Sequence, residues 1–172
     1  MSYRTLKINK NNIIGIIHII DTDATYLGEL YAHDNGEHDF RYEEDGIHAD
    51  SKERIMKRNQ NKASAMDKLA NTNTILGLPY KAYYMSCNLD HVISNTRNES
   101  DEQGVKTDAA LDFSDKYEND LDGFVQFINA ADLIFQGDYK ETWRQIREGR
   151  NSIDRHSNLH LFVNDPFGQI GR

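Results

Sequence analysis

The apolar run from Ile13 to Ile20, followed at once by Asp21-Thr22-Asp23, constrains the fold more than any other feature of the sequence. The run is rich in β-branched residues and is interrupted only by Gly15 and His18. Such a pattern is typical of a strand buried on both faces of a largely parallel sheet. It is far shorter than the roughly 20 apolar residues that a membrane-spanning helix needs. We therefore expect a central strand and no membrane association.

The rest of the chain alternates patterns of strands and helices. In chain order we expect a β-hairpin within Tyr26–Tyr42 around Asn35-Gly36, a helix from Asp50-Ser51 to about Leu69, a strand at Leu78–Cys87, helices at Val105–Tyr117, Leu121–Leu133 and Tyr139–Glu148, and a last strand at Leu159–Val163. This order predicts a single α/β domain over residues 1–172. We expect three layers, with a small, mostly parallel sheet flanked by helices and a β-hairpin insertion.

The charge of the chain is acidic overall but unevenly distributed. There are 28 acidic and 20 basic side chains, and the formal net charge is −8. This balance argues against a protein that coats duplex DNA over a whole face. The stretch from Ser51 to Lys68 is nevertheless basic and allows a local contact with nucleic acid, whereas residues 99–122 hold most of the excess acid and could contact a protein partner. The single cysteine, Cys87, excludes an internal disulfide and fits the cytoplasm.

Asp21 and Asp23 are the strongest candidates for chemistry. Ligands of open α/β sheets bind outside the carboxyl ends of the strands, where the first strand would deliver both carboxylates. Such a pair can hold Mg²⁺, or Mn²⁺, through hard oxygen ligands while the metal keeps water and phosphate oxygens in its other positions. The alternative is a strand that simply ends in polar turn residues. We favour the metal site.

A second polar group follows the strand at Leu78–Cys87, in the stretch from Ser86 to His91. If the two strands are parallel neighbours, this stretch lies close to the first aspartate pair. Asp90 would then add a third metal ligand, and His91 would act as a general acid or base. Equally well, Ser86, Asn88 or Asp90 could cap a helix, with His91 on its surface.

Two further features have structural explanations that we prefer. Gly137-Asp138 could deliver a carboxylate to the same metal, but Gly137 ending one helix and Asp138 capping the next fits the pattern better. His33 and His38 would lie opposite one another across the expected hairpin turn, at a distance that suits a transition metal. An exposed polar hairpin is the simpler interpretation.

The order of these motifs resembles the Toprim superfamily, in particular its bacterial defence-associated branch of OLD-like and RloB-like proteins. The resemblance rests on Asp21-Thr22-Asp23 after an apolar strand, a basic helix, and a second strand that ends in Ser86–His91. It implies a nuclease-like domain in which the aspartates bind Mg²⁺ for phosphodiester chemistry in bacterial or phage defence. In such a domain we expect residues of the basic helix to screen the phosphates of nucleic acid: Arg54, Lys57, Arg58 and Lys62. The family's upstream glutamate is missing from Met1–Asn12, so the chain either lacks a first βα unit or is inactive.

Asp21-Thr22-Asp23-Ala24-Thr25 also resembles the first motif of the haloacid dehalogenase-like phosphohydrolases. That resemblance implies a phosphatase in which Asp21 is the nucleophile and Asp23 the general acid or base, with Ser86 as a second motif. The family's lysine has no clear counterpart, because Lys106 and Lys116 lie in expected helices. A third hypothesis is a non-catalytic α/β module that binds a protein through residues 99–122.

Overall fold

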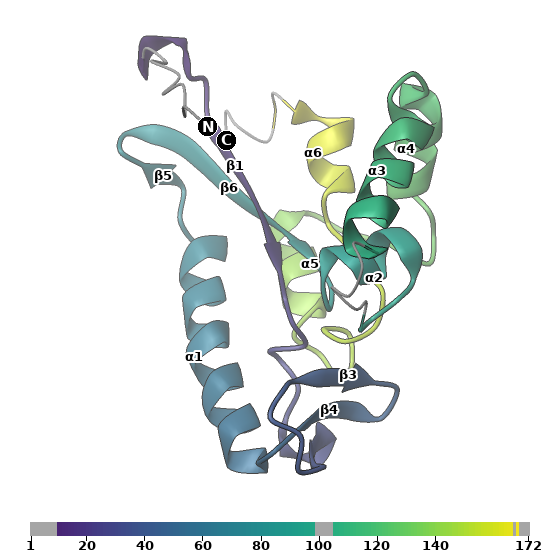
Figure 1. The fold of residues 1–172 in the computed structure, drawn as a ribbon. Helices are drawn as coiled ribbons and strands as arrows, with labels where there is room; N and C mark the ends of the chain where they lie inside the picture. The colour runs from purple at the N-terminus through teal and green to yellow at the C-terminus, as the bar shows by residue number, and fades with distance from the viewer. Residues whose placement is uncertain (1–9, 99–104, 167, 169–172) are drawn as a thin grey trace, which may run out of the picture.

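The computed structural model describes residues 10–98, 105–166 and 168. Its strands are β1 (Ile16–Asp21), β2 (Ala32–Asp34), β3 (Arg41–Glu43), β4 (Gly46–Ala49), β5 (Thr74–Ile75) and β6 (Leu78–Met85) (Figure 1). Its α-helices are α1 (Lys52–Ala70), α2 (Leu89–Ser94), α3 (Val105–Tyr117), α4 (Leu121–Ile128), α5 (Tyr139–Gln145) and α6 (His160–Asn164). The expected α/β class is therefore confirmed.

The strands form two small mixed sheets rather than one. In the first sheet β1 runs parallel to β6, and β5 pairs antiparallel with the other edge of β6. In the second sheet β2 runs parallel to β4, and β3 pairs antiparallel with β4. The second sheet follows the first strand directly in the chain, so the two sheets meet near the carboxyl end of β1 (Figure 1).

The expectation that the first strand is central and buried on both faces is wrong. Within the described residues β6 lies between β1 and β5, so β1 is an edge strand. Ile19 on β1 is 49% exposed, whereas Tyr83 and Tyr84 on β6 are fully buried. An apolar run indicates a strand, but it does not indicate which strand gains neighbours on both sides. The bulky aromatic side chains of β6 make it the strand at the core.

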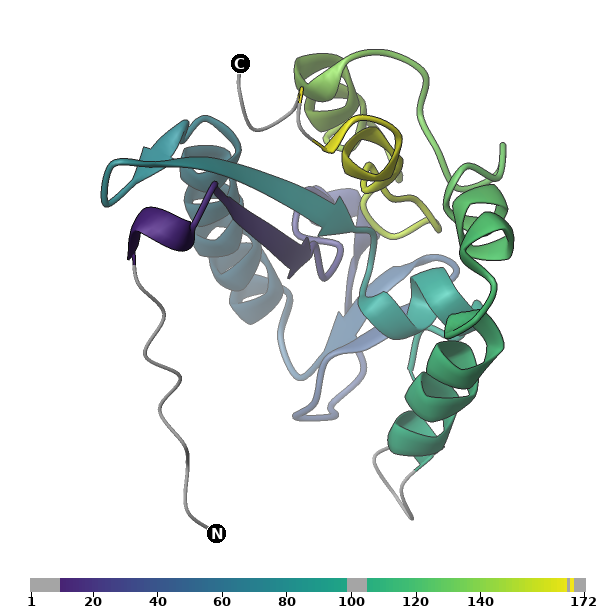
Figure 2. The same ribbon diagram turned by 90° about the horizontal axis from the view of Figure 1, so that it is seen from above.

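Helices pack on both faces of β6. On one face Tyr80, Ala82 and Tyr84 pack with Met66 of α1 and Trp143 of α5. On the opposite face, side chains from α2, α4 and α6 surround Tyr83 and Met85, as the alternation of side chains along a strand requires. Figure 2 shows the strands passing between these helices. The core thereby fixes the position of the carboxyl ends of β1 and β6.

The predicted hairpin is displaced along the chain. Asn35-Gly36 does not join two paired strands: the Glu37 N–H donates to Asn35 Oδ1 at 2.9 Å, and the chain continues as a loop. The hairpin is formed instead by β3 and β4, around Glu44-Asp45. Since β2 pairs with β4, His33 does not lie opposite His38. Its partner in register is His48.

Gly46 makes this second sheet possible. Its φ is +147°, a conformation that side chains rarely allow, and a Cβ at this position would lie 2.1 Å from the Tyr31 carbonyl oxygen. The backbone of the segment before β2 thus passes directly over Gly46. A residue with a side chain could not let the two segments approach so closely.

The helices follow the sequence expectations with shorter ends. The helix α1 begins after Ser51, whose Oγ accepts the Arg54 N–H at 3.2 Å. The Val105–Tyr117 helix has the expected bounds, but the Leu121 helix ends at Ile128 and the Tyr139 helix at Gln145. No described helix is both long and apolar enough to cross a membrane.

Of three expectations for the C-terminal part, one is confirmed and two are wrong. Asp138 caps α5 as expected, with the Glu141 N–H donating to its Oδ1 at 2.9 Å. Gly137 does not end a helix, because α4 has already ended at Ile128. Residues 159–163 form most of the helix α6 and not a strand. A short apolar run does not distinguish a strand from a helix. This run packs against Tyr83 as a single helical turn.

Candidate active site

Three loops meet where β1 and β6 end. The Thr22 N–H donates to the Met85 carbonyl at 2.9 Å, and the Asp23 N–H donates to the Cys87 carbonyl at 2.5 Å, so the parallel pairing continues past both strands. The Cys87 N–H in turn donates to the Ser152 carbonyl at 3.2 Å. The expectation that the two polar motifs lie side by side rests on parallel pairing, and that pairing is present.

The backbone of these loops is strained. Asp23, Ala24 and Cys87 have φ values of 46°, 54° and 43°, in the left-handed region that residues other than glycine avoid. Each costs about 1 kcal/mol or more and persists only where surrounding contacts hold it. Ala24 and Cys87 are fully buried, which supplies those contacts. Such conformations gather at functional sites, and here they flank the aspartates.

Asp23 is held by two basic side chains of α1. Its carboxylate forms ion pairs with the Lys62 ammonium and, at 3.4 Å, with Arg58 Nη2. Arg58 Nη1 also donates to the Asp23 carbonyl oxygen at 2.8 Å. Arg58 and Lys62 are four residues apart and therefore share one face of the helix. The sequence predicted both as phosphate contacts, and the structure shows them in contact with the aspartate loop.

Asp21 lies between like charges. Its side chain is exposed, but the nearby protein still desolvates it in part, which raises its pKa first, and the Asp23 carboxylate raises it further. The Lys62 ammonium and the backbone N–H of Leu89, at the start of α2, oppose these effects, while the Asp90 carboxylate adds to the increase. The three aspartates predicted as metal ligands therefore act on one another electrostatically, at one edge of the sheet.

The donor atoms and the electrostatics at this edge fit Mg²⁺. Carboxylate oxygens are the ligands that this ion prefers. A cation beside Asp21 would also relieve the repulsion that raises the pKa of this carboxyl. Lys62 already supplies part of that positive charge at Asp23. The oxygens of Asp21, Asp23 and Asp90 do not form a group of three within 4.8 Å of one another in the described part of the chain, and the Asp23 carboxylate is paired with Lys62.

His91 does not join the aspartates. Its side chain is buried, and the charged groups that act on its ring are Arg97, Arg155 and Asp154. Desolvation, followed by the two guanidinium groups, lowers its pKa to about 4. The ring is therefore neutral near pH 7 and faces the interior. It is therefore not the exposed helix residue of the capping interpretation, and its role as a general acid or base stays a prediction.

The other polar residues of this motif stabilise the loops. Asn88 caps α2, accepting the His91 N–H at 2.8 Å, so the capping interpretation is confirmed for this residue. The Ser86 hydroxyl is buried within reach of the carbonyl oxygens of Asn151 and Asp154, at 2.8 and 2.5 Å. Ser86 therefore anchors the 151–157 loop and does not face the aspartates.

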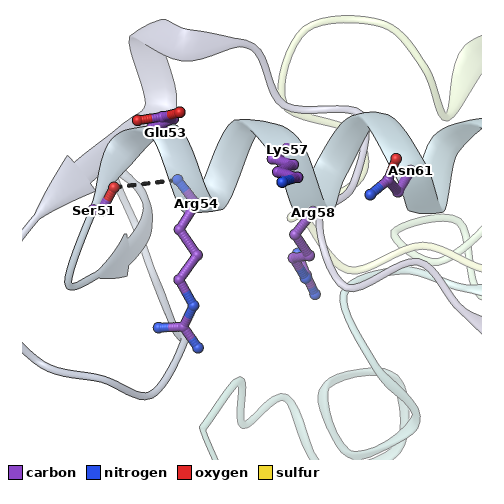
Figure 3. Close-up of a pocket in the computed structure, with 6 residues that line it drawn as sticks. All are labelled: Ser51, Glu53, Arg54, Lys57, Arg58 and Asn61. Carbon is purple, nitrogen blue, oxygen red and sulfur yellow. Dashed lines mark hydrogen bonds between the residues drawn. The ribbon is translucent and has the colours of Figure 1, made fainter.

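The basic face of α1 continues from this edge toward the second sheet. A shallow depression of about 470 Å³ is lined by Ser51, Glu53, Arg54, Lys57, Arg58 and Asn61. Figure 3 shows Arg54 and Arg58 on the same side of the helix. Both guanidinium groups lie over the Phe40 ring, 4.6 and 4.9 Å from its centroid. Lys57 has no hydrogen-bond or ion-pair partner within the described part of the chain. Of the other predicted phosphate contacts, Arg54 pairs with Asp50 at 2.7 Å, and Arg58 and Lys62 pair with Asp23.

The expected protein-binding segment at residues 99–122 is only partly described. Residues 99–104 lie outside the described residues, and the remainder forms α3 and the start of α4. Carboxylates such as Asp112 and Asp115 on α3 are exposed. No partner chain is part of the structure, so this interface stays a prediction.

Comparisons of the chain with protein-family models, curated proteins and solved structures find no match. The two family resemblances therefore stay predictions, carried by the motifs alone.

Two contributors to this edge were not predicted from the sequence. Leu89 acts through its backbone N–H, which the position of Asn88 as a helix cap could have indicated. The second is the 151–157 loop, which contributes carbonyl oxygens to Ser86 and Cys87. No local signal in the sequence connects that loop to these residues.

Proposed function

We propose that the protein is a Mg²⁺- or Mn²⁺-dependent hydrolase that cleaves phosphodiester bonds in nucleic acid. The observation that carries this proposal is the parallel pairing of β1 with β6, which brings the two aspartate motifs together at the carboxyl ends of these strands. There, desolvation and the Asp23 and Asp90 carboxylates raise the pKa of Asp21. A site that concentrates negative charge in this way is stabilised by a divalent cation.

In this proposal some residues bind the metal ion and others contact the substrate phosphate. Asp21 and Asp90 would hold the ion, and a divalent ion bound there would supply Lewis-acid chemistry to a phosphoryl oxygen and a water molecule. Arg58 and Lys62 hold the Asp23 loop in place and present positive charge to the reacting phosphate. His91 takes no part in proton transfer, because its neutral ring is buried beside Arg97 and Arg155.

The basic surface of α1 favours a polymeric substrate. Arg54 and Lys57 lie beyond Arg58 on the same helix, so phosphates flanking the reacting one would meet further cations. With a net charge of −8, binding should be confined to this surface and should weaken as the salt concentration rises.

The proposal includes the layered arrangement of the fold. Around β1 and β6 we propose three layers within a single domain, with α1 and α5 on one face and α2, α4 and α6 on the other. This arrangement places the carboxyl ends of the parallel strands at an open edge, where ligands of α/β folds bind.

Incubation with plasmid DNA and a single-stranded oligonucleotide, each with Mg²⁺ or Mn²⁺, tests the proposal. We expect Asp21→Asn and Asp90→Asn to reduce the cleavage rate by about 100-fold, because each removes a charge from the metal site. Asp112→Asn is the matched control, since it removes an exposed carboxylate from α3. Equal cleavage by wild type and both site variants would contradict the proposal.

A phosphomonoesterase is the second candidate, and the position of Lys62 favours it. The resemblance to haloacid dehalogenase-like enzymes implies a strand-loop lysine; Lys62 lies in the helix α1 and not in such a loop, but it brings an ammonium group to Asp23. This candidate predicts hydrolysis of a generic phosphomonoester, no cleavage of DNA, and a beryllofluoride adduct on Asp21. If neither reaction occurs and Mg²⁺ leaves the melting temperature unchanged, the non-catalytic module becomes the better description.

A further inference from the structure

A second group of candidate ligands lies on the small sheet, away from the aspartates at the strand ends. The parallel pairing of β2 and β4 places His33 and His48 in register, so their side chains leave the same face of the sheet. Their rings are stacked, with centroids 4.7 Å apart and an interplanar angle of 29°. Two imidazoles are thus held side by side by the backbone of the sheet.

Asp45 joins the two histidines. It lies in the turn between β3 and β4, and its Oδ1 is 2.8 Å from His48 Nε2 while its Oδ2 is 3.8 Å from His33 Nε2. The three ligand atoms all lie within 4.8 Å of one another. Both rings therefore direct the same nitrogen, Nε2, toward one carboxylate. No other such group of three occurs among the described residues.

This geometry suits a transition metal. Bonds of about 2.0–2.1 Å in a tetrahedral site separate neighbouring ligand atoms by about 3.3 Å. The present separations bracket that value, and the Asp45 side chain is 63% exposed, so it can adjust without disturbing the core. Two imidazole nitrogens and one carboxylate oxygen are a donor set that zinc uses, with a further position left for water.

The charges around the cluster do not oppose a cation. Arg41 is the register partner of His48 on β3, but its guanidinium is bound to the Glu37 carboxylate at 2.9 Å. A cation at Nε2 would replace the proton that each imidazole shares with Asp45.

We propose that His33, Asp45 and His48 form a binding site for a divalent transition-metal ion such as Zn²⁺, separate from the proposed Mg²⁺ site. The ion would connect β2, β4 and the β3–β4 turn across a sheet whose strands are only three or four residues long. Binding to the folded state alone stabilises that state, so the ion would act as a staple for the second sheet. This proposal does not depend on the hydrolase activity.

Titration of the metal-free full chain with Co²⁺ and Zn²⁺ tests the proposal. The Asp21→Asn variant is used as the background, so that the aspartate edge contributes little. We expect one Co²⁺ per chain with the visible absorption of tetrahedral coordination, its displacement by Zn²⁺, and a higher melting temperature. A large excess of Mg²⁺ should leave the Co²⁺ spectrum unchanged, because imidazole nitrogen is a poor ligand for Mg²⁺.

Variants of the cluster separate this site from other surface histidines. In the same background, His33→Gln and His48→Gln should each weaken Co²⁺ binding by about tenfold or more. His38→Gln is the matched control: its ring is more exposed and binds Asp50, so Co²⁺ affinity should not change. Asp45→Asn alters only an exposed turn and keeps the test valid if a histidine variant fails to fold. A spectrum without tetrahedral bands, or an equal loss in His38→Gln, would overturn the proposal.

Discussion

Two groups of candidate metal ligands lie within reach of the same helix, and they are built in different ways. The aspartate edge (Asp21, Asp23 and Asp90) forms where long parallel strands end, between strained loops and beside cations of α1. The histidine cluster (His33, Asp45 and His48) lies on short strands at the surface, and no lysine or arginine of the described residues forms an ion pair with it.

The comparison shows how scaffold and chemistry are matched. At the aspartate edge a buried core holds hard oxygen ligands, and Lys62 already offsets part of their charge, so a metal there must compete with a side chain. In the histidine cluster the ligands are softer and the competing ion is only a proton, but the scaffold is weak. We therefore expect the two groups to respond to different perturbations.

The largest expected effect breaks the histidine cluster by disturbing its sheet. Gly46→Ala should lower the free energy of unfolding by about 3 kcal/mol or more, because the new Cβ would collide with the Tyr31 backbone at an unfavourable φ. Gly36→Ala is the matched control: its φ is also positive, at +76°, but the space around it is open, so we expect about 1 kcal/mol. Urea unfolding measures both. Similar losses in the two variants would show that the close approach at Gly46 is unimportant.

Acid should weaken the region beside the aspartate edge. The pKa of His91 is lowered from 6.5 to about 4 in the folded state, so the unfolded chain binds more protons between these values. The stability that neutral His91 contributes is therefore complete above pH 6.5 and is lost as the pH falls toward 4, by about 3 kcal/mol. Burial also lowers the pKa of His156 and His160, which adds to the same trend.

Urea unfolding at several pH values measures this dependence. His91→Gln should flatten the slope of stability against pH between 4 and 6.5, whereas His38→Gln, which replaces an exposed ring, should keep the wild-type slope. An unchanged slope in His91→Gln would show that this residue is not the source.

Replacing Lys62 tests whether its ammonium group competes with Mg²⁺ at the aspartate edge, a competition that the histidine cluster lacks. Lys62→Gln should increase the affinity for Mg²⁺ several-fold, which corresponds to about 1 kcal/mol, because Asp23 loses its ion-pair partner. Lys57→Gln is the control on the same helix: it should weaken DNA binding without changing Mg²⁺ affinity. Isothermal titration with Mg²⁺ distinguishes them. Weaker Mg²⁺ binding in Lys62→Gln would mean that the ammonium organises the site and does not compete with the ion.

The smallest expected effect is an absence of reaction at Cys87. Its side chain is fully buried, in a cluster with Ile47 and Ala49 of the second sheet, and burial raises the pKa of its thiol to about 12. The folded protein should therefore react with a thiol reagent at pH 8 only as fast as it unfolds, and at once in denaturant. Rapid labelling of the folded chain would show that the two sheets separate readily.

The sequence was informative where local signals and strand direction coincide. An apolar run before Asp21 and a second one before Ser86 indicate two strands, and parallel pairing brings their carboxyl ends together, so Asp90 could be placed near Asp21. The position of Ser51 before a helical pattern likewise marked the start of α1. These predictions needed only one assumption about distant segments, namely that the two strands pair in parallel.

The rest depends on contacts between distant segments. His48 pairs with His33 because β2 and β4 run parallel, and a loop between parallel strands carries no short turn signal. Asn35-Gly36 is a strong hairpin signal, yet in the structure it lies in a loop and does not join two paired strands. The ion pair between Lys62 and Asp23 joins residues 39 positions apart and depends on where α1 crosses the strand ends.

The length of α1 has a consequence for how this chain can change. Its first residue is fixed to the second sheet by the hydrogen bond from the Lys52 N–H to Asp34, and Arg58 and Lys62 are fixed to the Asp23 loop further along. A single residue inserted after Arg58 would rotate Lys62 by about 100° about the helix axis and carry it away from Asp23. The number of residues in the helix therefore determines whether Lys62 faces Asp23 when the start of the helix is bound to the second sheet. Insertions and deletions within it should be far more damaging than those in the surrounding loops.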